Sequence, residues 1–343
     1  MAMTDSLDNA LLALLAEHRL PGLSFAVIGG GQITCARGYG FADPARQVPV
    51  TADTLFQAAS ISKCLTALAA LRLVDPGRLT LDEDVNERLR SWKIPASEFI
   101  QSERVTLRRL LSHQAGINVH GFAGYATGQP LPTLIQVLNG TLPANNSAIR
   151  VNAIPGTQPR YSGGGYTVLQ QLLTDVTGQP FGDLMQEIVL QPLGLTASAF
   201  AQPLPVSLEK LAATGHDKNG QPIPGGAHSY PEMAAAGLWT TPSDLAKFAL
   251  GIQDALAGQP GAILTPALAR EMLTVQAGVY GLGPSITGHG LARKWFHSGR
   301  NAGFDALLLT EVETGQGVAI MTNANVNSQV LNEILQAIGA MTG

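Results

Sequence analysis

The sequence predicts an α/β fold of the α+β type, in which the two ends of the chain build one antiparallel sheet flanked by helices. Short β-rich runs that bracket glycine-containing turns lie near both ends, at 23–28, 33–39, 306–312 and 317–322. The long stretch between them has the apolar spacing of helices instead. We therefore expect a sheet domain formed by residues 1–62 and 236–343, an inserted, mainly helical domain formed by residues 63–235, and a functional cleft between the two.

Composition and charge restrict the class of protein. The 343 residues are 45% hydrophobic and 13% charged, which is enough apolar material for one large core or two connected cores. A net charge of −4 and scattered basic residues give no surface for nucleic acid. No apolar stretch is long enough to span a bilayer, and residues 1–6 do not resemble a signal peptide. We expect a cytoplasmic protein with no nucleic-acid or membrane partner. Cys35 and Cys64 are too few for a disulfide framework.

The individual elements follow from local patterns. An amphipathic segment at 7–18 predicts a surface helix, and 328–341 predicts a closing helix. The run Gly29-Gly30-Gly31-Gln32 predicts a hairpin turn rather than a phosphate loop, because no lysine with serine or threonine follows. Glycine and proline separate the expected middle helices, at 106–111, 132–138, 165–177, 181–189 and 243–252. The proline-rich and glycine-rich stretch 201–231 predicts a long loop near a site.

Ser60 and Lys63 are spaced as Ser-x-x-Lys at the start of an apolar helix that Asp75-Pro76-Gly77 ends. If Ser60 begins this helix, Lys63 stands one turn later on the same face, within reach of the hydroxyl. A lysine activates a serine only when burial or another charge lowers its pKa, here by roughly 3 units. The helix N-terminus also offers free N–H groups for an oxyanion. The alternative is that Ser60 is an N-cap and Lys63 an ordinary first-turn lysine.

Tyr161 precedes a serine and three glycines just before another expected helix, so it is presented on a turn. A phenol beside a lysine loses its proton more easily, because the ammonium favours the phenolate. The alternative is a tyrosine packed on the helical domain.

His297 begins the short strand segment His297-Ser298-Gly299, followed by Arg300. The glycine lets a substrate chain lie close to the strand edge, and the imidazole can donate a hydrogen bond or, when protonated, attract a carboxylate. The alternative is a structural histidine.

Ser60-Ile61-Ser62-Lys63, Tyr161-Ser162-Gly163 and His297-Ser298-Gly299 together resemble, in order and spacing, the three motifs of the serine penicillin-recognising superfamily. The resemblance is to its branch of class C beta-lactamases, D-alanyl-D-alanine carboxypeptidases and family VIII carboxylesterases. Two further stretches, 105–117 and 236–245, are similar to conserved segments of these proteins, and the likeness runs from about residue 20 to residue 322. The resemblance implies a beta-lactamase/transpeptidase-like fold.

The resemblance also implies residue roles. Ser60 would attack a carbonyl and form an acyl-enzyme, while Lys63 and Tyr161 share the proton transfers. The backbone N–H groups of Ser60 and Arg300 would hold the oxyanion, and His297, Ser298 and Gly299 would line the substrate site. No cofactor or metal is implied, and the seven histidines show no metal-ligand spacing. In the relatives, the motif that contains His113 has a structural role.

Two departures from the family pattern indicate the substrate. Gly163 stands where lactamases of this branch carry an asparagine, so an amide that would grip a substrate amide is missing. His297 stands where a lysine is usual, which weakens a permanent positive charge. Both favour small esters over lactams, so we expect a serine carboxylesterase or related acyl hydrolase or acyltransferase. The alternatives are a beta-lactamase or D-amino-acid-specific peptidase, and a binding protein with a degenerate site. Three aromatic residues are expected either to line an acyl pocket or to lie in the core: Tyr125, Trp239 and Phe304.

Overall fold

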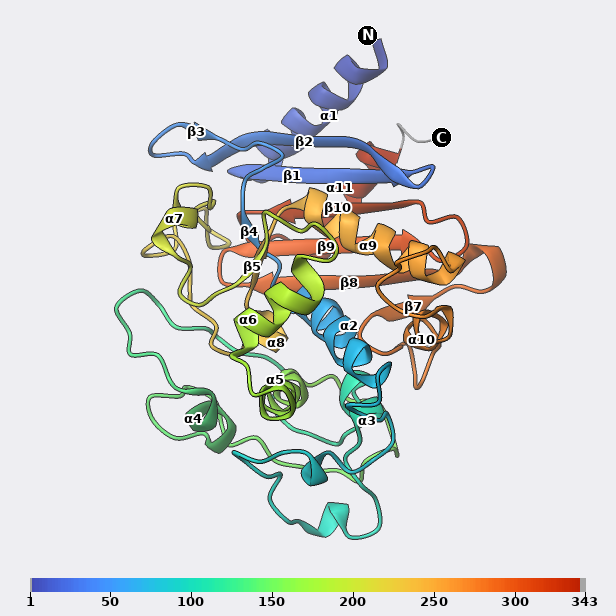
Figure 1. Ribbon diagram of the computed structural model, residues 1–343. Coiled ribbons are helices and arrows are strands. Elements are labelled where there is room, and N and C mark those ends of the chain that lie inside the picture. The colour runs from blue at the N-terminus through green and yellow to red at the C-terminus, as the bar shows by residue number, and fades with distance from the viewer. Residues whose placement is uncertain (1, 340–343) are drawn as a thin grey trace.

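The computed structural model describes residues 2–339, with side chains from residue 6 onward. A seven-stranded antiparallel sheet dominates it, in the order β3-β2-β1-β10-β9-β8-β7 (Figure 1). The strands from the two ends of the chain meet where β1 pairs with β10, Leu23 opposite Thr322 and Val27 opposite Val318. The bounds are β1 Gly22–Gly29, β2 Gln32–Asp43, β3 Val48–Pro49, β7 Ser285–Thr287, β8 Lys294–Asn301, β9 Phe304–Glu311 and β10 Gly317–Thr322. The prediction of one sheet built from both chain ends is confirmed.

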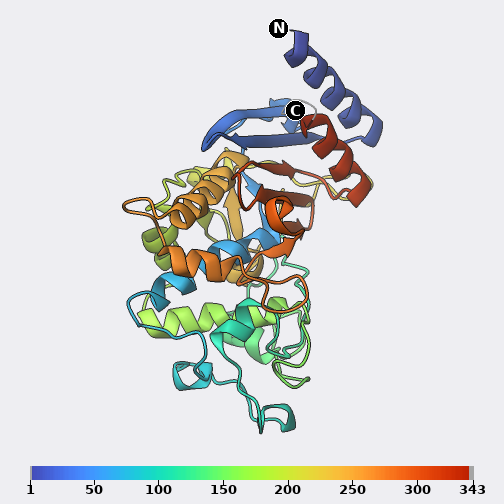
Figure 2. The same ribbon diagram turned by 90° about the vertical axis from the view of Figure 1, so that its right-hand side faces the viewer.

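Helices cover both faces of the sheet. Successive side chains of a strand point to opposite faces, and apolar side chains point to both. Phe25 and Val27 of β1 pack with the terminal helices α1 (Ala2–His18) and α11 (Ser328–Gly339). The intervening Ala26 and Ile28 belong to the main core beneath the other face, against which α9 (Pro242–Ala257) packs. Figure 2 shows the terminal helices and α9 on opposite sides of the sheet. Residues 340–341 of the expected closing helix lie outside the described residues.

Most of the regular secondary structure in the middle of the chain is helical. Its central element is α2, which runs from Ser62 to Val74 and ends before the Asp75-Pro76-Gly77 turn. The remaining helices are α3 Leu107–Leu111, α4 Leu134–Asn139, α5 Gly163–Thr177, α6 Phe181–Met185, α7 Val206–Glu209, α8 Met233–Ala236 and α10 Pro266–Met272. The expected helix at 181–189 is α6 followed by a π-helical turn, η4 Gln186–Leu190. The expected loop at 201–231 contains only α7.

A small second sheet connects distant parts of the chain beside α2. It has the order β4-β6-β5, with β4 Phe56–Gln57, β5 Ala199–Phe200 and β6 Leu238–Thr240. Phe56 lies opposite Thr240, so the segment just before Ser60 is tied to the segment just after α8. Short 3-10 turns complete the chain: η1 Ala59–Ile61, η2 Val85–Glu87, η3 Glu98–Ile100 and η5 Gly290–Ala292. The assignment of residues 63–235 to a separate inserted domain stays a prediction.

None of the helices in residues 2–339 combines the length and hydrophobicity that a bilayer crossing needs. Cys35, in β2, and Cys64, in α2, are both free thiols.

Candidate active site

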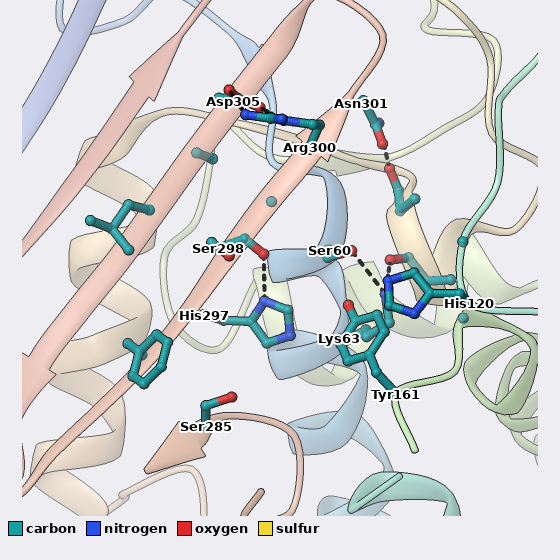
Figure 3. Close-up of a pocket in the computed structure, with 18 of the residues that line it drawn as sticks. Ser60, Lys63, His120, Tyr161, Ser285, His297, Ser298, Arg300, Asn301 and Asp305 are labelled. Atoms are coloured by element: carbon teal, nitrogen blue, oxygen red, sulfur yellow. Dashed lines mark hydrogen bonds and ion pairs between the residues drawn. The ribbon is translucent and has the colours of Figure 1, made fainter. Parts of the chain in front are cut away.

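Ser60 and Lys63 are in hydrogen-bond contact, with 3.0 Å between Ser60 Oγ and Lys63 Nζ (Figure 3). Ser60 does not begin α2 as expected; it lies in the 3-10 turn η1, and α2 begins at Ser62. The preceding residue, Ala59, has φ of +49°, a conformation that is rare for a residue with a side chain. Such strain persists only where the surroundings enforce it, and it is common beside functional groups. The turn therefore presents the serine hydroxyl while keeping it within reach of the lysine.

Lys63 is 2% exposed and surrounded by the apolar body of α2. Its Nζ also donates a hydrogen bond of 2.7 Å to the carbonyl oxygen of Ala235. Burial lowers the pKa of Lys63 from 10.5 to about 7. A large fraction of this amine is therefore neutral near pH 7, and its lone pair can accept the proton of Ser60. The expected lowering of the lysine pKa is confirmed.

Tyr161 lies just before α5, with its ring centroid 5.0 Å from Lys63 Nζ. The next residue, Ser162, caps α5 by accepting a 2.9 Å hydrogen bond from the N–H of Gly165. Burial raises the pKa of Tyr161 above its ordinary value, although a hydrogen bond to Ser60 partly opposes this. The expectation that the lysine would ease loss of the phenol proton is therefore wrong, because burial outweighs the effect of an amine that itself loses its charge. Tyr161 keeps its proton at neutral pH.

His113 positions Tyr161 from beneath. It is 2% exposed, and its ring centroid lies 4.3 Å from that of Tyr161. Its Nδ1 accepts a 3.1 Å hydrogen bond from the N–H of Ser162, and its carbonyl accepts one of 2.7 Å from the N–H of Arg160. Both neighbours of Tyr161 are thus fixed by one residue. Burial lowers the pKa of His113, so the imidazole stays neutral and Nδ1 can accept. This is the structural role expected for His113.

His297 lies on β8 and faces the same cleft (Figure 3). Its Nδ1 is 2.7 Å from the carbonyl oxygen of Ser298. Because a carbonyl only accepts, Nδ1 carries the hydrogen and Nε2 presents a lone pair. Burial, with a contribution from the charge of Lys63, lowers the pKa of His297 to about 3. The imidazole is neutral, so the suggestion that it attracts a carboxylate in its protonated form is wrong.

Gly299 brings β8 against the turn that carries Ser60. A Cβ atom at this position would collide with the carbonyl oxygen of Ala58 and lie 3.1 Å from the Cβ of Ala59. The space that was expected to admit a substrate chain is therefore filled by the protein itself. Close approach of the strand to η1 places the third motif beside the nucleophile.

The register of β8 and β9 turns the backbone N–H of Arg300, which lies in the wall of the cleft, away from β9. In two antiparallel strands, residues that face each other form backbone hydrogen bonds to each other at every second position only. Asn301 and Phe304 flank the two-residue turn and form a hydrogen-bonded pair. Arg300 and Asp305, the next pair along the strands, are therefore not hydrogen-bonded to each other through their backbones.

The guanidinium of Arg300 makes two hydrogen bonds to the Asp305 carboxylate, at 2.8 and 2.7 Å, so most of its charge is compensated.

These groups line one cleft of about 960 Å³. Every residue expected at the site contributes to its wall: Ser60, Lys63, Tyr161, His297, Ser298, Gly299 and Arg300. Tyr125, Trp239 and Phe304 are buried core residues at 2%, 4% and 0% exposure, and they are not among the described residues that line the cleft. In the part of the chain that the structure describes, no group of three or more histidine, cysteine, aspartate or glutamate side chains is placed to hold a metal.

Several residues of the cleft are not marked by any of the three sequence motifs. His120, Phe122 and Tyr280 line it, and the carbonyl of Ala235 holds Lys63. A backbone carbonyl leaves no signal in the side-chain pattern. His120 and Phe122 lie in the 115–133 loop, which the sequence predicts to shape the pocket without indicating which of its residues line it.

The fold and this cleft are those of the beta-lactamase-fold family of serine hydrolases. The chain belongs to the beta-lactamase family, whose model matches residues 7–340. Penicillin-binding protein 4 of Amycolatopsis lactamdurans is 27% identical over 357 residues, covering 96% of this chain and 88% of that protein. Protein flp of Staphylococcus aureus is 25% identical, and the chain spans 64% of its length. Esterase EstB of Burkholderia gladioli is 32% identical over 224 residues, covering 64% of this chain and 55% of that protein.

Solved structures share the fold. The octameric penicillin-binding protein homologue from Pyrococcus abyssi superposes with a TM-score of 0.81 at 26% identity, covering 99% of this chain and 77% of that chain. The beta-lactamase-like fold expected from the three motifs is confirmed.

Proposed function

We propose that the protein is a serine esterase or related acyl hydrolase that forms an acyl-enzyme on Ser60 and prefers small carboxylic esters to lactams. The observation that carries the proposal is the 3.0 Å contact between Ser60 Oγ and an amine whose pKa burial lowers to about 7. An amine in this state can take the hydroxyl proton, which a charged lysine cannot do. The 32% identity with an esterase over 224 residues supports the same class of reaction.

The reaction begins when Ser60 Oγ attacks the carbonyl carbon and its proton passes to neutral Lys63. The N–H groups of Ser60 and Arg300 hold the oxyanion of the tetrahedral intermediate, each contributing about 3 kcal/mol. When the intermediate collapses, the bond to the alcohol oxygen breaks. That oxygen takes the hydroxyl proton of Tyr161, which Lys63 then replaces. Water repeats the sequence on the acyl-enzyme and releases the acid, or an alcohol takes the place of water.

Two features favour esters over amides. Gly163 provides no side-chain amide, and a Cβ there would lie 3.0 Å from the ring of Phe122 and 3.1 Å from the carbonyl of His120. Neutral His297 supplies no positive charge for the carboxylate of a lactam or a D-alanyl peptide. An alkoxide also leaves more readily than an amide nitrogen. A D-specific peptidase remains the second candidate because of the 27% identity to a penicillin-binding protein over nearly the whole chain.

Three substrates test the proposal: p-nitrophenyl butyrate, nitrocefin and a D-alanyl amide. We expect the ester to be turned over with the highest kcat/KM. Mass spectrometry after treatment with a fluorophosphonate should show an adduct on Ser60 that the Ser60→Ala protein lacks. If the adduct forms on Ser60 but nitrocefin is turned over with a higher kcat/KM than the ester, the protein is a lactamase instead. Absence of both turnover and adduct would indicate a binding protein with a degenerate site.

A further inference from the structure

The loop formed by residues 118–122 is fixed on the first turn of α5 by three successive carbonyl groups. The carbonyl of Asn118 accepts a 2.7 Å hydrogen bond from Ser162 Oγ. The carbonyls of Val119 and His120 accept bonds of 3.0 and 2.9 Å from the N–H groups of Gly164 and Gly163. The loop therefore satisfies backbone donors that a helix N-terminus otherwise leaves free, and these bonds anchor it to α5.

This position is obtained at the cost of backbone strain. Val119 has φ of +60°, a left-handed conformation that is unfavourable for a β-branched residue. The two glycines that follow Ser162 also make room for the loop, because a Cβ on Gly164 would lie 2.7 Å from the carbonyl oxygen of Asn118. Strain of this kind persists where the structure enforces it, often to hold a functional group in place.

The group held in this way is the side chain of His120. It is exposed, it lines the cleft, and its ring centroid lies 4.9 Å from that of Tyr161. Figure 3 shows it across Ser60 from β8, so the reacting serine lies between His120 and the third motif. Within residues 2–339, neither ring nitrogen of His120 has a hydrogen-bond partner. His113, by contrast, uses Nδ1 to position the backbone.

We propose that His120 is a substrate-binding residue that hydrogen-bonds a polar substituent of the ester held at Ser60. An imidazole offers a donor and an acceptor on opposite sides of one ring, so it suits a hydroxyl or amide group. The enzyme then selects esters with such a substituent over apolar esters of the same size. The substituent is carried by the acyl chain or by the alcohol. This inference rests on the proposed esterase activity.

Matched ester pairs separate the two sources of the substituent. For the acyl chain, p-nitrophenyl 3-hydroxybutyrate is compared with p-nitrophenyl 3-methylbutyrate; for the alcohol, 2-hydroxyethyl butyrate is compared with propyl butyrate. We expect His120→Phe, which keeps a ring against Tyr161, to lower kcat/KM roughly tenfold for the polar ester of one pair, mainly through KM. The apolar ester of that pair should change less than about twofold. His120→Asn, which keeps a donor and an acceptor, should retain part of the selectivity.

The matched control is His289→Phe, because His289 is an exposed histidine that is not among the described residues of the cleft. It should leave both ratios unchanged. If His120→Phe lowers turnover of both esters of each pair equally, His120 only supports Tyr161, and the proposal is wrong. The proposal is also wrong if His120→Phe leaves the ratio of kcat/KM between the polar and the apolar ester unchanged in both pairs. If His120→Phe does not fold, His120→Asn provides the same test. If wild-type protein turns over no ester and binds no fluorophosphonate, the esterase proposal itself has failed.

Discussion

The Nζ atom of Lys63 donates a 2.7 Å hydrogen bond to the carbonyl oxygen of Ala235, which lies 172 residues later in the chain. This bond orients the amine, because a neutral lysine that gives one hydrogen to Ala235 can turn its lone pair toward Ser60. Ala235 in turn is placed by α8, where the N–H of Ala234 donates to Gln170 Oε1 on α5. The base of the proposed reaction is therefore held by three helices at once: α2, α5 and α8.

Ester hydrolysis should depend on pH through Lys63. Its pKa is lowered to about 7, so below this pH the amine is charged and cannot accept the proton of Ser60. We expect kcat/KM to rise with pH and to level off above about 7. Lys63→Ala should lower kcat/KM by about a hundredfold or more and remove this rise. A wild-type profile that is flat from pH 5 to pH 9 would contradict the assignment of Lys63 as the base.

Tyr161→Phe should separate proton transfer from packing. The variant keeps the ring that contacts His113 but loses the hydroxyl that protonates the leaving alcohol. We expect kcat to fall by about a hundredfold, with little change in melting temperature. The loss should be smaller for a p-nitrophenyl ester than for an alkyl ester, because p-nitrophenolate leaves without protonation. Equal losses on both esters would argue against Tyr161 as the proton donor.

Gly163→Asn should not create lactamase activity, although it restores the side chain found in lactamases of this branch. The new side chain meets the Phe122 ring and the backbone carbonyl of His120, so the variant should lose about 1–3 kcal/mol of unfolding free energy. Adding Phe122→Ala should relieve part of the overlap. Chemical denaturation and nitrocefin turnover measure the two effects. Full stability together with rapid nitrocefin hydrolysis would contradict the prediction.

Glu232 should make folding stability depend on pH. Its side chain is 0% exposed, both carboxylate oxygens lack a partner among the described residues, and burial raises its pKa from 4.5 to about 7. A raised carboxyl pKa means that the folded state holds the proton more tightly than the unfolded state. Its contribution to stability is therefore complete below pH 4.5 and is lost as the pH rises from 4.5 to about 7, by up to about 1.4 kcal/mol per pH unit, after which the curve levels off.

Glu232→Gln should flatten this pH dependence, because an amide does not ionise. Denaturant unfolding at several pH values between 4.5 and 8 measures the difference between the two proteins. Glu209→Gln, at an exposed position, is the matched control and should follow the wild type. Parallel curves for wild type and Glu232→Gln would show that the carboxyl is not buried in the way described.

The sequence determined the fold class and the reactive groups. Short β-rich runs at both ends predicted one antiparallel sheet built from the two ends of the chain, and these ends meet where β1 pairs with β10. The spacing of Ser60 and Lys63 predicted their contact, since both the turn and the helix bring residues three apart onto one face. The resemblance of the three motifs to a known family identified Tyr161 and His297, but the sequence wrongly predicted that the Tyr161 phenol loses its proton more easily than usual.

Only the tertiary structure decided those charges and the shape of the cleft. A pKa depends on how completely the folded chain excludes water from a group, and burial keeps Tyr161 protonated and His297 neutral. The fit of Gly299 against Ala58, and of the 118–122 loop against Gly163, depends on backbone atoms that side-chain patterns do not report. The sequence therefore determined which groups are present, and packing between distant segments determined their protonation and what can bind beside them.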